Sequence, residues 1–169
     1  MGTTTSNALS DFNTADDAAA RELLLTCAAV PRWAEEVASG RPYPDVEAVL
    51  DAARNAAPWT DADVDAALAR HPRIGERAEG EEADAAHSRR EQSGVDTSDT
   101  TTAERLRAGN RAYEERFGHV FLIRAAGRSA EEILAALEQR LTNDPATERR
   151  IVAEQLREIA VLRLQGELS

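Results

Sequence analysis

Prolines, glycines and capping residues divide this chain into short segments, most of which have the periodicity of an α-helix. Pro31, Gly40 and Pro58 each end a segment, and Thr60 is a good N-cap for the next one. The predicted helices cover 16–30, 33–39, 45–57, 61–70, 85–93, 101–117, 130–141 and 147–164. A chain divided in this way is restricted to packing short helices against one another.

Length and composition agree with a helical fold. The chain has 169 residues, which suffices for one domain with a real core but not for two ordinary domains. Alanine, leucine, glutamate and arginine dominate, and aromatic residues make up only 4%. We predict an all-α, single-domain helical bundle of about seven to nine helices over 8–169, preceded by a disordered N-terminus at 1–7.

One segment breaks the helical pattern. Val120 to Ala125 has no polar face and is rich in residues that favour strands, yet no second convincing strand is present to pair with it. We therefore predict an extended segment packed into the helical domain, with backbone N–H and C=O groups that need partners. A ligand rich in amide groups would supply them; alternatively, the segment is a buried connector satisfied by neighbouring side chains or water.

Charge and cysteine content exclude several classes of protein. The formal net charge is 20 minus 31, or −11, which opposes binding to nucleic acid or to an anionic membrane. Cys27 is the only cysteine and lies in an apolar run, which favours a buried structural thiol over a nucleophile. That run is too short to span a bilayer and has no basic flank, so we predict a cytoplasmic protein.

Two motifs in the middle of the chain carry groups suited to proton transfer. His71 precedes Pro72, which restricts it to extended dihedrals and places the imidazole at a helix end. Ser88, Glu91 and Gln92 have the i, i+3, i+4 spacing that puts three side chains on one helix face. Alternatively, Ser88 and Glu91 form a capping box and His71 is an ordinary helix-terminal histidine.

Arg163 occupies the next position on the apolar stripe of the last predicted helix, after Val152, Leu156 and Ile159. An arginine that faces a core is costly unless it is paired or hydrogen-bonded, which would suit a pocket for an anion. Alternatively, it extends outward in the last turn and complements the helix dipole.

The segments that carry a resemblance to a known family are Leu9-Ser10-Asp11-Phe12-Asn13, Trp33-Ala34 through Arg41-Pro42-Tyr43, HPRIGER at 71–77, SRREQSG at 88–94, Asn110-Arg111-Ala112-Tyr113, Phe117-Gly118-His119-Val120-Phe121 and Arg163-Leu164. Together they resemble one enzyme family, the 2-oxo-4-hydroxy-4-carboxy-5-ureidoimidazoline (OHCU) decarboxylases. Members release CO2 during urate breakdown and form (S)-allantoin. In this chain His119 and Arg124 depart from the family pattern, because the family often has an aromatic residue and a proline before Val120 and an uncharged segment after it.

The resemblance implies a site and a reaction. His71 would transfer a proton, Glu91 would orient it, and Arg163 would bind the anionic substrate. No cofactor or metal is expected, because a C=N bond in the substrate accepts the electron pair that CO2 leaves behind. A homodimer is also implied. The substrate-binding residues would be Pro72 as a wall, Ser88 and Gln92 at the ureido or ring amide groups, and Phe121, Leu122, Ile123, Arg124 and Ala125 through their backbone.

Two rival functions follow from the same residues. His71, His87, Glu91 and His119 are candidate metal ligands, and His87 with Glu91 has the i, i+4 spacing of a helical metal pair, as in a metal-dependent hydrolase. The chain lacks an H-x-x-x-H pair, however. The other rival is a non-catalytic helical interaction module with HPRIGER as a surface epitope.

Overall fold

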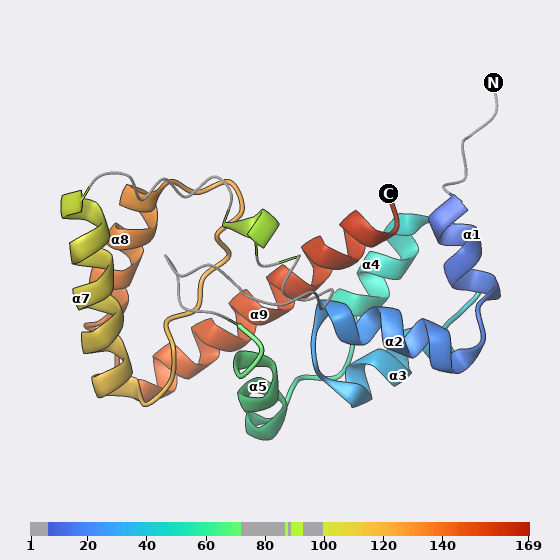
Figure 1. The fold of residues 1–169 in the computed structure, drawn as a ribbon. Helices are drawn as coiled ribbons and strands as arrows, with labels where there is room; N and C mark the ends of the chain where they lie inside the picture. Colours follow the sequence, from blue (N-terminus) through green and yellow to red (C-terminus); the bar gives the residue numbers. More distant parts are fainter. Residues whose placement is uncertain (1–6, 72–86, 88, 93–99) are drawn as a thin grey trace. The chain divides into compact units, whose positions relative to one another are not determined.

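A computed structural model describes residues 7–71, 87, 89–92 and 100–169 (Figure 1). Within these ranges all regular secondary structure is helical, which confirms the predicted all-α class. A short helical piece at 87 and 89–91 adds to the larger helices. These are α1 Asn7–Thr14, α2 Asp17–Cys27, α3 Pro31–Ser39, α4 Val46–Asn55, α5 Asp61–Leu68, α7 Thr100–Phe117, α8 Ala130–Arg140 and α9 Pro145–Glu167.

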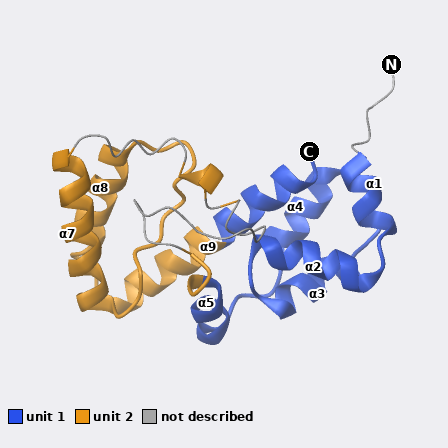
Figure 2. Ribbon diagram, in the orientation of Figure 1, with its two compact units in different colours: residues 1–67, 157–169 blue, residues 68–156 orange. Residues whose placement is uncertain are grey.

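The chain divides into two compact units (Figure 2). Unit 1 comprises residues 1–67 and 157–169, and unit 2 comprises residues 68–156. Helix α9 begins in unit 2 and ends in unit 1. Unit 1 is therefore discontinuous in sequence, whereas unit 2 is one continuous stretch.

In unit 1, α3 packs against both α2 and α4. Trp33 is buried and donates from its indole N–H to the Ala53 carbonyl at 3.1 Å, which joins α3 to α4. The predicted N-cap at Thr60 is confirmed, because its hydroxyl accepts from the Asp63 N–H at 3.1 Å. Pro31 begins α3 instead of only stopping the helix before it, as suits a residue with fixed φ and no N–H to satisfy.

Helix α1 lies where no helix was predicted. Its carbonyl end is satisfied from the loop after α3: the Arg41 guanidinium donates to the carbonyls of Phe12 and Ala15 at 2.8 and 2.6 Å. The Asn13 side chain accepts from the Tyr43 N–H at 2.8 Å and donates to the Tyr43 carbonyl at 2.9 Å. These long-range bonds stabilise a helix whose own sequence has little helical preference.

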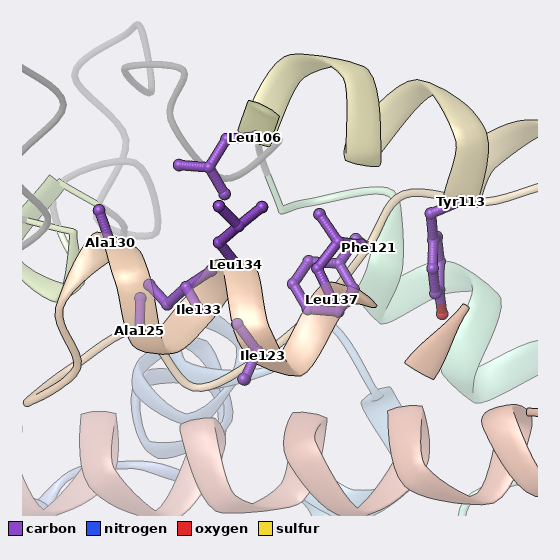
Figure 3. Packing of buried hydrophobic residues seen from close by; sticks show 9 residues of the cluster. All are labelled: Leu106, Tyr113, Phe121, Ile123, Ala125, Ala130, Ile133, Leu134 and Leu137. Atoms are coloured by element: carbon purple, nitrogen blue, oxygen red, sulfur yellow. The ribbon is translucent and has the colours of Figure 1, made fainter. Parts of the chain in front are cut away.

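In unit 2, α7 and α8 pack side by side around one hydrophobic cluster (Figure 3). Gly109 lets the two helices approach closely, because a Cβ there would lie 2.6 Å from Cδ2 of Leu137. The connector between the helices also contributes side chains to the cluster. Its buried members are Leu106, Tyr113, Phe121, Ile123, Ala125, Ala130, Ile133, Leu134 and Leu137.

The connector from α7 to α8 contains the segment predicted to be non-helical, and residues 120–125 are indeed neither helix nor strand. It begins at Gly118, whose φ of 78° lies in the left-handed region and whose N–H donates to the Glu114 carbonyl at 2.8 Å. This is an αL helix cap, which favours glycine. The connector ends at Ser129, which forms a capping box with Glu132 at the start of α8.

Candidate functional site

His71 lies just beyond the end of α5, in the first residues of unit 2. Helix α5 ends at Leu68, two residues before the predicted end, and the His71 N–H donates to the Leu68 carbonyl at 3.0 Å in a closing turn. The side chain is half-buried. The prediction of an imidazole after a helix end is therefore confirmed, whereas Pro72 lies outside the described residues.

The second motif is described in part. Residues 87 and 89–91 are helical, and both Glu91 and Gln92 are half-buried. Ser88 lies outside the described residues, so its predicted place beside Glu91 and the alternative capping box both remain predictions. The predicted helical backbone is confirmed where it is described.

The imidazole of His87 lies beside a guanidinium. His87 is buried, and Nη2 of Arg90 lies 2.8 Å from its Nδ1. Because a guanidinium has donors only, Nδ1 accepts this bond and the ring proton is on Nε2. A cation at this nitrogen opposes its use as a metal ligand. Among the residues that the structure describes, no three His, Cys, Asp or Glu side chains are grouped as a metal site would require.

Side chains of unit 2 bond backbone groups along the connector. Nδ1 of His119 lies 3.0 Å from the Val120 carbonyl, and three groups at Leu122 and Arg124 are also bonded. The Leu122 carbonyl accepts from Nη1 of Arg140 at 2.6 Å. The Arg124 N–H donates to Oε1 of Gln155 at 2.9 Å, and the Arg124 carbonyl accepts from Nε of Arg128 at 2.9 Å. For these three groups the alternative of a connector satisfied by neighbouring side chains is correct.

Arg140 belongs to a buried polar cluster that the sequence did not indicate. Its Nε and Nη2 both donate to Oε1 of Glu148, at 2.8 and 2.5 Å, and the Tyr113 hydroxyl donates to the same oxygen at 2.5 Å. Glu148 is 0% exposed. Burial, and then the hydrogen bond to Glu148, raise the pKa of the Tyr113 hydroxyl. The three side chains come from α8, α9 and α7.

These residues were missed because each has an ordinary local explanation. Arg140 is a basic residue in the last turn of α8, and Glu148 is an acidic residue in the first turn of α9. Both positions suit the helix dipole on a solvent-exposed surface. The one available signal was Tyr113, which belongs to a segment that resembles the OHCU decarboxylases.

Arg163 is buried within α9 and belongs to unit 1, whereas the other candidate residues described belong to unit 2. Its exposed fraction is 4%, so the alternative of an outward-extending arginine is wrong. Nη1 of Arg163 lies 3.5 Å from the carbonyl of Cys27, at the end of α2. Cys27 itself is 1% exposed, which confirms the predicted buried thiol.

None of the described helices is both long and apolar enough to cross a membrane.

Comparison with known proteins agrees with the resemblance of the motifs. The OHCU decarboxylase of Amia calva is 37% identical over 140 residues, covering 80% of this chain and 79% of that protein. The enzyme of the same name from Haloferax volcanii is 30% identical over 140 residues, covering 82% of each. A crystal structure of OHCU decarboxylase in the presence of (S)-allantoin has a similar fold, with a TM-score of 0.66 at 24% identity over 86% of this chain and 96% of that one. A sequence model of OHCU decarboxylase matches residues 13–165, and this chain therefore belongs to the OHCU decarboxylase family.

Proposed function

We propose that this chain decarboxylates 2-oxo-4-hydroxy-4-carboxy-5-ureidoimidazoline to (S)-allantoin in urate degradation, with His71 as the proton-transfer group. The observation that carries the proposal is the family match over residues 13–165, because this range includes both central motifs, the connector and Arg163. All the candidate residues therefore lie within the matched range.

The reaction requires the protein mainly to position the substrate and the groups that act on it. The substrate carries its carboxylate on a ring carbon that also bears a hydroxyl and adjoins a C=N bond. As CO2 leaves, the electron pair delocalises into that C=N bond, so the substrate provides its own electron sink. The protein must orient the substrate, place charge near it and deliver a proton to one face.

His71 is suited to proton transfer because its side chain is accessible to solvent while its backbone is held in a turn. The turn that follows α5 fixes its N–H, while the half-buried side chain keeps contact with solvent from which protons are exchanged. We assign Glu91, half-buried on the short helical piece, to orient the imidazole or the substrate hydroxyl.

The remaining contacts are assigned by group type. Arg163 binds the anionic substrate through its planar fork, and Ser88 and Gln92 bind the ureido or ring amide groups. Pro72 forms a wall beside His71.

We assign backbone contacts with the substrate to the connector. Its hydrogen bonds within the protein limit which of its backbone groups can make them. The Leu122 carbonyl and both backbone groups of Arg124 are already engaged by protein side chains. The Ala125 carbonyl also accepts a bond, from the Arg128 N–H at 3.1 Å. We therefore place the direct backbone contacts at Phe121 and Ile123 and at the N–H groups of Leu122 and Ala125, with Arg124 holding the segment in place.

The test generates the unstable substrate in situ from urate, with urate oxidase and hydroxyisourate hydrolase, and follows the circular dichroism of the allantoin formed. We expect His71→Asn to stay folded and to lose about 10²–10⁴ in rate, the usual contribution of a general acid–base group. His119→Asn is the matched control: it removes an imidazole that has no part in the proposed proton transfer, and the asparagine amide can keep the contact of 3.0 Å that Nδ1 of His119 makes with the Val120 carbonyl. Production of (S)-allantoin at the wild-type rate by folded His71→Asn would remove His71 from the mechanism.

Independence from metal is tested in the same assay. A cofactor-free decarboxylase retains full activity in excess chelator, whereas a reaction that depends on a metal bound by His71 or His87 is lost. Loss of allantoin formation that returns on adding a divalent metal would contradict the cofactor-free mechanism. We further propose a homodimer, on the family resemblance alone, and sedimentation equilibrium measures its mass directly.

A further inference from the structure

The structure points to a role for Arg140 in positioning the connector. We infer that Arg140, held by Glu148 and Tyr113, is a positioning residue that fixes the Leu122 carbonyl and thereby the backbone of the neighbouring Ile123. This inference rests on the proposed function, in which that backbone contacts the substrate.

The guanidinium of Arg140 divides its donors between two tasks. Nε and Nη2 bind one oxygen of Glu148, and Nη1 binds the Leu122 carbonyl at 2.6 Å. Because the fork is planar and rigid, fixing two of its nitrogens also fixes the direction of the third. The same guanidinium lies 4.6 Å from the ring centroid of Phe121, so Arg140 contacts two consecutive residues of the connector.

Glu148 is in turn held from three sides. Oε1 accepts from the Tyr113 hydroxyl as well as from Arg140, and Oε2 accepts from Nδ2 of Asn143 at 3.1 Å. The carboxylate is fully buried, and the Arg140 side chain is 8% exposed. Arg140 is thus bonded into a fixed frame that reaches α7, α8 and α9.

Stability alone does not account for this arrangement. A buried ion pair contributes little net stability, because the cost of removing two charges from water offsets their attraction. What a hydrogen-bonded pair provides is a fixed geometry, here at the middle of the connector assigned to the substrate. A displacement of about 1 Å in a substrate-positioning group is enough to reduce a rate substantially.

The experiment compares Arg140→Lys with Tyr113→Phe. Lysine keeps the charge beside Glu148 but cannot hold the carboxylate and the Leu122 carbonyl in one planar fork. Tyr113→Phe removes one bond to Glu148 and leaves the bond from Arg140 to Leu122 intact, so it is the matched control. Both should lower the melting temperature. We expect only Arg140→Lys to weaken allantoin binding, by about tenfold, and to speed amide exchange in peptides covering 120–126.

A second variant covers the case in which Arg140→Lys does not fold. Arg140→Met with Glu148→Leu, in the Tyr113→Phe background, removes both buried charges while keeping similar volume, an exchange that proteins often tolerate. It should also lose about tenfold in allantoin affinity relative to Tyr113→Phe. In folded variants the pH profile of the residual activity should stay that of the wild type, because His71 is untouched.

Wild-type allantoin affinity and wild-type exchange in both Arg140 variants would overturn the inference. Failure of the wild-type enzyme to form allantoin would instead overturn the proposed function. Exchange in the connector distinguishes the two failures, because it reports whether Arg140 orders this segment without reference to any reaction.

Discussion

At the scale of single residues, Arg163 is the side chain whose buried position most needs a function. A guanidinium that holds an anion through two parallel bonds is not replaced by an ammonium, which keeps the charge but loses the fork. We predict that Arg163→Lys weakens binding of allantoin by about tenfold, measured by calorimetric titration, since a charge-assisted bond is worth about 1.5–3 kcal/mol. Arg163→Met should abolish activity while the melting temperature holds or rises, because a buried charge is removed.

The matched control is Arg157→Lys, the same change six positions earlier on α9. Arg157 lies 3.4 Å from the Arg54 carbonyl and has no assigned role in the site. The Arg157→Lys substitution should leave the affinity for allantoin unchanged. Undiminished affinity in Arg163→Met would mean that the buried arginine is purely structural, with its contact to Cys27 as the reason for its position.

The same scale shows what a residue's own pattern can predict. The apolar stripe of the last helix left both a buried and an outward-extending Arg163 open, and only the family resemblance favoured a pocket-facing side chain. Cys27 was predicted to be buried, because it lies in an apolar run. The Arg140–Glu148 pair was not, because both residues occur at helix ends where exposed charges are common. Their burial depends on partners from three helices, which no local pattern contains.

At the scale of helices, Gly109 sets how closely α7 and α8 approach. Alanine favours a helix over glycine by about 0.5–1 kcal/mol, but at Gly109 its Cβ would meet Leu137 at 2.6 Å. We predict that Gly109→Ala lowers the free energy of unfolding by about 1–3 kcal/mol, the usual cost of overpacking. Gly166→Ala on α9 is the control and should be neutral or stabilising, because among the described residues nothing beyond its chain neighbours and its own helix backbone lies within 4 Å of the added Cβ. Denaturant titration measures both, and equal stabilisation by the two changes would contradict a close contact.

Helix boundaries were predictable where the signal is local. The Thr60 cap and the break at 120–125 were found, and most helices lie within a few residues of their predicted bounds. Helix α1 was missed because two buried apolar residues, Leu9 and Phe12, are too few to establish a helical period. Its end is capped by Arg41, which lies 26 residues beyond Ala15 in the sequence.

At the scale of the whole molecule, the buried hydroxyl of Tyr113 predicts a loss of stability at high pH. Burial raises its pKa above the value of about 10 of an unfolded tyrosine. The contribution of the protonated hydroxyl is therefore fully present below pH 10 and is lost as the pH rises above it, by about 1.4 kcal/mol per unit. Tyr113→Phe should be less stable than wild type by about 1.5–3 kcal/mol near pH 8, with the difference narrowing near pH 11.

Melts of the two proteins across this range check the prediction. Other alkaline effects, including repulsion within a chain of net charge −11, act on both proteins and cancel in the difference. A difference that stays constant from pH 8 to pH 11 would show that Tyr113 ionises as readily in the folded state as in the unfolded one.

The discontinuous make-up of unit 1 also constrains how the protein is made. Its last segment, residues 157–169, carries Leu164 and Leu168, both 0% exposed. The first 67 residues leave the ribosome long before this segment is synthesised, so during translation they lack part of their own core. Unit 2 is continuous and has all its residues earlier. The unit whose first residues are translated first is therefore the last to have all of its residues. Termination of translation anywhere before residue 157 leaves unit 1 without the buried leucines of its last segment.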